Sequence, residues 1–140
     1  MQSRLTQVWL LLLAVGGAVP GGWAVALPRN FYDEFPGFGR HWVSADGPYN
    51  EHLVRDVGGF FLALAVITVF ALWLGSIAAA RLAALGWLVY GVPHALYHAT
   101  HLGVYAPLDQ VLAMALLVLG VVLPILVLVW PGRRAVAEST

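Results

Sequence analysis

The sequence predicts an all-α integral membrane protein, a four-helix bundle with one long outer loop. The first observation behind this prediction is composition: of 140 residues, 61% are hydrophobic and only 10% are Asp, Glu, Lys or Arg, whereas an ordinary soluble domain is roughly 45–50% apolar and about 25% charged. The second is the spacing of the charges. They leave four charge-free runs of 23 to 27 residues, and a helix that crosses the hydrocarbon core of a bilayer needs about 20 apolar residues.

The four runs place the predicted helices at about 8–27, 57–75, 82–102 and 108–130, with the outer loop at about 28–50. A membrane β-barrel would instead show segments of about ten residues that alternate between apolar and polar positions, and these runs do not alternate. Because no repeat or linker divides the chain, residues 1–140 are expected to form one membrane domain.

The Arg residues predict the orientation. Four spans put both termini on the same side, together with Arg4, Arg81, Arg133 and Arg134. Three other Arg residues lie in or beside the long loop, where they count less toward orientation. Both termini are therefore expected in the cytoplasm. The absence of Lys and the abundance of Ala, Val, Leu, Gly and Arg are typical of a GC-rich bacterial genome, so the expected location is a bacterial inner (plasma) membrane.

The first span allows two interpretations, and both stay open. As a retained helix, it carries Gly17 and Gly21 four residues apart, a small-residue pair suited to close helix packing. As a cleaved signal peptide, it combines Arg4, an apolar stretch and the A-x-A triplet at residues 24–26. Cleavage after Ala26 would leave three spans and an external N-terminus.

The composition also excludes several kinds of chemistry. The chain has no Cys, which excludes disulfides, thiolate metal sites and Cys nucleophiles. Seven basic and seven acidic residues leave no net charge that would attract nucleic acid. The outer loop is rich in Phe, Tyr and Trp, which favour the headgroup zone, so it is expected to fold on the outer surface as a functional segment or a simple lid. Asp109, at the start of the last helix, is expected to act as a helix cap.

The third predicted helix carries a polar stripe in its outer half. At about 100° per residue, Tyr90, His94, His98 and His101 fall within one narrow sector of that helix. Such a stripe is expected to face the bundle interior or a wet cavity rather than lipid. Pro93 lacks a backbone N–H and is expected to kink the helix beside these side chains.

The second predicted helix adds further candidate ligands. Asn50 is a typical N-cap residue for it, and His52 and Asp56 lie four residues apart on one face. If this helix packs antiparallel to the next, both side chains reach the level of the histidine stripe. Imidazole and carboxylate groups bind Zn, Fe or Cu(II), and a haem could be held between His52 and a histidine of the stripe. The predicted metal ligands are His94, His98, His101, His52 and Asp56, with Tyr90 and Tyr97 beside the cofactor.

Other functions fit the same residues, and whether the protein is an enzyme is open. The histidines could merely hydrogen-bond to one another, to Tyr97 and to water. The chain could be a non-catalytic accessory subunit of a membrane complex, or a small proton-linked or quinone-linked transporter. The expected partners are the lipid bilayer and either a second copy or a larger membrane complex. In the subunit interpretation the contact points would be Gly17, Gly21, Gly58 and Gly59.

The layout resembles small bacterial four-helix membrane proteins of the DoxX-like type. The shared features are a glycine-rich first helix, an external aromatic loop, and N-E-H-L-V-R-D-V-G-G-F-F-L-A at residues 50–63. The resemblance covers the first two spans best and implies a fold rather than an activity. The H-A-L-Y-H-A-T-H segment at residues 94–101 is not a feature of that group and could mark a distinct subfamily.

Overall fold

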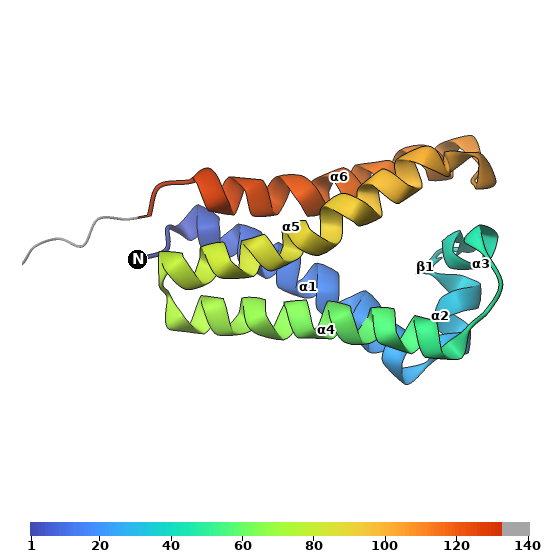
Figure 1. Cartoon of the computed structure of the whole chain (residues 1–140), viewed down its shortest axis with the longest axis horizontal. Helices are drawn as coiled ribbons and strands as arrows, with labels where there is room; N and C mark the ends of the chain where they lie inside the picture. The colour runs from blue at the N-terminus through green and yellow to red at the C-terminus, as the bar shows by residue number, and fades with distance from the viewer. Residues whose placement is uncertain (133–140) are drawn as a thin grey trace, which may run out of the picture.

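The computed structural model describes residues 1–132, and four long helices form its frame (Figure 1). The predicted all-α class is confirmed. Arg133 and Arg134, which contribute to the predicted orientation, lie outside the described residues. In chain order the elements are α1 (Arg4–Ala26), α2 (Pro28–Glu34), β1 (Pro36–Gly37), β2 (Arg40–His41), α3 (Trp42–Asp46), α4 (Glu51–Leu74), α5 (Ile77–Thr100), the 3-10 turn η1 (Leu102–Val104) and α6 (Pro107–Val129).

Side-chain caps explain where three of the long helices begin. Ser3 accepts a hydrogen bond from the Thr6 amide, and Ser76 accepts one from the Ala79 amide. Asn50 caps α4 through the Leu53 amide, as predicted. Each cap satisfies a backbone donor that the first turn leaves unpaired. Helix α4 therefore begins at Glu51, directly after the predicted cap, and its charged first turns precede the apolar span predicted from residue 57.

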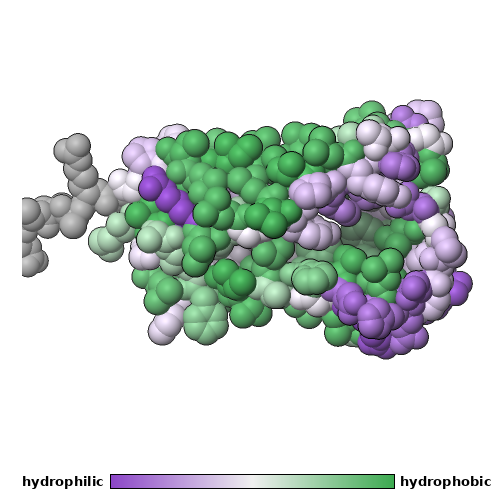
Figure 2. Space-filling view, in the orientation of Figure 1, coloured by the Kyte–Doolittle hydropathy of each residue, from purple (hydrophilic) through white to green (hydrophobic). Residues whose placement is uncertain are grey.

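Three of the long helices, α1, α4 and α6, are long and apolar enough to cross a membrane. The fourth, α5, has 24 residues but carries Arg81 and several Tyr and His side chains. Figure 2 shows an apolar surface over the middle of the molecule and hydrophilic residues gathered where α2 and α3 lie. We call the end of the molecule that holds α2 and α3 the loop end. The opposite end holds the α4–α5 turn, where the backbone N–H of Gln2 donates to the Gly75 carbonyl at 3.0 Å.

Helices α1 and α4 pack with their backbones almost in contact. A Cβ atom placed on Gly17 would lie 2.9 Å from the Phe61 carbonyl oxygen, and one on Gly21 would lie 2.9 Å from the Gly58 carbonyl oxygen. The small-residue pair predicted for the first span is therefore confirmed. The same glycines were expected to contact a partner in the subunit interpretation. Here Gly17, Gly21 and Gly58 are covered within the chain, while a Cβ atom placed on Gly59 would have nothing within 4 Å.

Two core clusters lie in the half of the bundle that is farthest from the loop. Leu10 of α1, Ala80 and Ala84 of α5 and Val127 of α6 form one cluster with no exposed surface. Beside it, the Trp87 indole donates to the Thr68 hydroxyl at 2.9 Å, which joins α5 to α4. Small side chains in the first cluster allow the helices to approach closely, as is usual in membrane bundles.

Toward the loop end the helices diverge. Figure 1 shows α5 turning away from α4 in its second half, and Pro93 lies within that part of the helix, as the sequence predicted. Figure 2 shows that the surface is hollowed at this end, between the α5–α6 pair and the α1–α4 pair. The segment between α1 and α4 occupies this end. Phe31 packs against Ala24 and Val54 on the α1–α4 side, while Trp42 packs against Tyr105 and Ala113 at the α5–α6 side.

This segment is more ordered than the loop that the sequence predicted. It contains two short helices and a tight hairpin in which Pro36 pairs with His41 and Gly37 with Arg40. The turn is made by residues 37–39, all with positive φ, and Phe38 at its tip is 99% exposed. The segment therefore bridges the two diverging helix pairs.

Candidate functional site

A row of rings lies on one face of α5 in its diverging half. Tyr90 stacks on His94 with ring centroids 5.1 Å apart, and His94 meets His98 edge-on at 4.8 Å. All three side chains are half-buried. Residues four apart lie above one another on a helix, so the predicted stripe is real for these three positions.

Other elements close both ends of the row. At one end, Phe61 of α4 contacts Tyr90 with ring centroids 4.9 Å apart. At the other, the Tyr105 hydroxyl lies 3.3 Å from Nδ1 of His98. Tyr105 follows η1 and is itself buried against Trp42 and Ala113. The row therefore runs from the α4–α5 interface to the loop end.

Asp46, at the end of α3, supplies a negative charge that acts on this row. It interacts electrostatically with His94, His98 and Tyr105. Burial, with a smaller contribution from Asp46, raises the pKa of Tyr105 to about 12, so that phenol stays neutral at physiological pH. Asp46 was not among the predicted site residues. No local signal distinguishes it from other acids of the loop, since it reaches α5 only through the tertiary fold.

His101 and Tyr97 form a second stacked pair, which adjoins the row where the Tyr97 ring meets His98 edge-on at 5.4 Å. Their rings stack at 4.1 Å with an interplanar angle of 13°, and both side chains are exposed. Nδ1 of His101 lies 2.8 Å from the Tyr97 carbonyl oxygen and 3.0 Å from the Thr100 hydroxyl. Helix α5 ends at Thr100, so His101 lies beyond the helix whose periodicity placed it in the stripe.

His52 and Asp56 contact each other on the surface of α4. Nε2 of His52 lies 2.9 Å from a carboxylate oxygen of Asp56, and the two side chains are 86% and 53% exposed. Val54 and Gly58, on the other face, are the buried positions of this first part of α4. The structure thus does not bring His52 or Asp56 to the row on α5.

The predicted five-ligand metal site is therefore not assembled as a unit. Among residues 1–132, no group of three or more His, Asp or Glu side chains is placed to hold a metal ion. What the fold does bring together is the His94–His98 pair, with Tyr105 against one imidazole and Asp46 near both.

Asp109 fastens the loop segment to α6. Its carboxylate accepts hydrogen bonds from the Arg40 guanidinium and, at 2.8 Å, from the Trp42 indole. The expected capping role is wrong, because the N-cap of α6 is Ala106 and no side chain caps this helix. The carboxylate still lies in the first turn, where the helix dipole favours it.

Comparison with protein-family models, with curated proteins and with solved structures finds no match to this chain. The resemblance to DoxX-like proteins stays a prediction.

Proposed function

We propose that this protein is an integral membrane four-helix bundle whose His94–His98 pair binds a divalent transition metal ion near the loop end. The pair itself is the observation that carries the proposal. Its ring centroids lie 4.8 Å apart. Two imidazoles on one ion, with metal–nitrogen bonds of about 2.0–2.1 Å, have ring centres roughly 4.5–5.2 Å apart.

The nitrogens of this pair are available for a metal. Among the described residues, no hydrogen bond engages either ring nitrogen of His94 or Nε2 of His98. In the tautomer in which Nδ1–H of His98 donates a hydrogen bond to the Tyr105 oxygen, Nε2 carries the lone pair that a metal requires. Oxygen acceptors of this kind commonly orient metal-binding histidines.

Asp46 is the best candidate for a third ligand or a compensating charge. Its carboxylate interacts electrostatically with both histidines, and coordination would require the loop segment that carries it to move toward the pair. With two histidines and one carboxylate, an ion such as Zn²⁺ keeps an open position for water or a substrate. A haem is a poorer fit because its second axial histidine would be His52, which is exposed and paired with Asp56.

The membrane placement is part of the same proposal. Alongside the three helices that are apolar enough to span, α5 has matching length and exposes Leu82, Leu85 and Val89 by 50% or more. Their outward exposure suits contact with lipid. With four spans both termini lie on one side with Arg4 and Arg81, and we place that side in the cytoplasm of a bacterium.

Metal binding by the detergent-purified full chain tests this function. Co²⁺ is a suitable probe because its visible spectrum reports the ligands and the geometry, and Zn²⁺ content is then measured by elemental analysis. We expect one ion per chain in the wild type and at least tenfold weaker binding in His94→Ala and in His98→Ala. His52→Ala is the matched control, since it removes a histidine from an equally spaced i, i+4 pair. Equal binding by the wild type and the His94→Ala/His98→Ala double variant would refute the proposal.

A further inference from the structure

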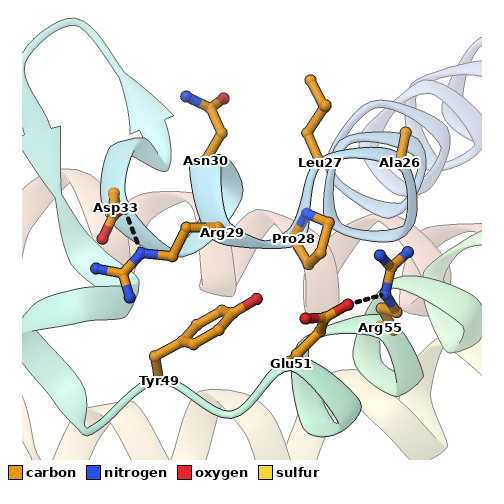
Figure 3. Close-up of a pocket in the computed structure, with 9 residues that line it drawn as sticks. All are labelled: Ala26, Leu27, Pro28, Arg29, Asn30, Asp33, Tyr49, Glu51 and Arg55. Carbon is orange, nitrogen blue, oxygen red and sulfur yellow. Dashed lines mark hydrogen bonds and ion pairs between the residues drawn. The ribbon is translucent and has the colours of Figure 1, made fainter.

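A second site lies on the other side of the loop segment, where the end of α1, α2 and the start of α4 meet. It is an open pocket of about 520 Å³ (Figure 3). Figure 3 shows Arg29 and Asp33 on α2, Glu51 and Arg55 on α4, and Tyr49 between them. Two cations and two anions thus line one pocket.

Both arginines are held in place with donors to spare. Nε of Arg29 donates to Asp33 at 2.7 Å, and its guanidinium lies 4.9 Å from the centre of the Tyr49 ring. The hydrogen bond to Asp33 raises the pKa of Arg29, so it remains a cation. Arg55 donates to Glu51 at 2.9 Å and to the Val25 carbonyl. A guanidinium has five N–H donors, so most of those of Arg29 and several of Arg55 remain for a ligand.

Tyr49 connects the two pairs. It interacts electrostatically with Arg29, Arg55 and Glu51, and partial burial together with Glu51 raises its pKa. Its neutral hydroxyl is one more hydrogen-bonding group in the pocket. Phosphate groups are commonly bound by more than one arginine, because each guanidinium offers paired N–H donors.

The position of the pocket points to a lipid. It lies at the last residues of α1 and the first turns of α4, two helices that are apolar enough to span a membrane. Helix ends of this kind lie at the level of the headgroups. Tyr49 lines the pocket, and Trp23 and Tyr32 pack with it against the neighbouring Phe31 cluster; aromatic side chains are enriched at membrane interfaces. Leu27 forms an apolar edge that is 59% exposed, against which an acyl chain can lie.

We propose that this pocket binds a zwitterionic phospholipid headgroup that carries a phosphate and a primary ammonium group, as in phosphatidylethanolamine. Arg29 and Arg55 donate to the phosphate oxygens, and Asp33 and Glu51 accept from the ammonium. The two acids make the pocket electrically neutral, so it disfavours a purely anionic headgroup. A choline headgroup has no N–H to donate. The proposal depends on membrane insertion but not on the metal site.

Native mass spectrometry of the delipidated full chain in detergent tests this binding site. The added ligands are phosphatidylethanolamine, phosphatidylcholine, phosphatidylglycerol and, as a separate arm, inorganic phosphate. We expect the ethanolamine lipid to bind best to the wild type, and about tenfold weaker binding in Arg29→Gln and Arg55→Gln. Arg81→Gln, at the opposite end of the molecule, is the control and should bind like the wild type. Asp33→Asn should reduce the preference for the ethanolamine lipid over phosphatidylglycerol.

The outcomes separate the parts of the proposal. Equal lipid retention by the wild type and the Arg29→Gln/Arg55→Gln double variant would overturn it. A wild-type preference for phosphatidylglycerol would overturn the role of the acids. Displacement of the lipid by millimolar inorganic phosphate would show a phosphate site with no lipid specificity and would also overturn it. Arg29→Gln removes an exposed ion pair and the contacts of the guanidinium with the Tyr32 and Tyr49 rings, and it should leave the fold intact. Its Co²⁺ binding should match that of the wild type, so failure here is distinct from failure of the metal site.

Discussion

The contact between α1 and α4 makes a quantitative prediction at Gly21. Replacement by alanine would place a Cβ atom 2.9 Å from the Gly58 carbonyl oxygen and 2.9 Å from the Phe61 Cβ. Non-bonded carbon atoms are most stable about 3.5–4.0 Å apart, so the two helices must separate locally by roughly half an ångström or more. No flexible side chain can move aside, because both contacts are made by backbone or Cβ atoms. Overpacking costs about 1–3 kcal/mol, and we expect the upper half of that range.

Gly22→Ala is the matched control for this prediction. Gly22 is the next residue of α1 and has nothing within 4 Å of its Cβ position. Both variants gain the same helix propensity, about 1 kcal/mol in the interior of a helix, so their difference isolates the overpacking. We expect Gly21→Ala to be about 2–3 kcal/mol less stable than Gly22→Ala in reversible unfolding in detergent, followed by tryptophan fluorescence and circular dichroism. Equal stability of the two variants would show that α1 and α4 do not approach this closely.

Two further predictions concern the loop end. Asp109→Asn should weaken the attachment of the loop segment to α6. We expect amide hydrogen exchange about tenfold faster in residues 35–46 and unchanged in α1. An exchange rate that changes equally along the whole chain would contradict this role. The pKa of Tyr105 is raised to about 12 from its ordinary 10.0. The unfolded chain therefore loses this proton at lower pH than the native one, and native stability should fall as pH rises from about 10 to about 12. Thermal unfolding measured at each pH tests this. Tyr105→Phe should remove the part of the fall in stability that comes from this phenol, and an unchanged pH profile would contradict the burial argument.

The sequence predicted the parts of this fold that depend on local patterns. Charge-free runs located the apolar lengths of the long helices, and the charged residues that bound those runs lie near the helix ends. Asn50 marked the start of α4, and Gly17 and Gly21 marked the face of α1 that meets it, because both signals act within one or two turns. The direction of Tyr90, His94 and His98 followed from helical periodicity in the same way.

Contacts between distant residues could not be predicted from local patterns. Trp42 and Asp109 are separated by 67 positions, and no pattern near either residue encodes their hydrogen bond. The interaction of Asp46 with the histidines was missed for the same reason, because it also joins residues far apart in the sequence. His101 failed as a stripe residue because α5 ends one residue before it, and helix ends depend on tertiary packing as well as on sequence.

The loop segment connects the two proposed sites physically. Phe35 packs against both the Phe31 cluster on the α1–α4 side and the Trp42 cluster on the α5–α6 side. The same segment carries Asp46, which interacts with the histidine pair, and Arg29, which lines the headgroup pocket. If a ligand at one proposed site shifted this segment, it would also displace a charged group at the other. In that case each ligand would change the affinity of the other by the same factor.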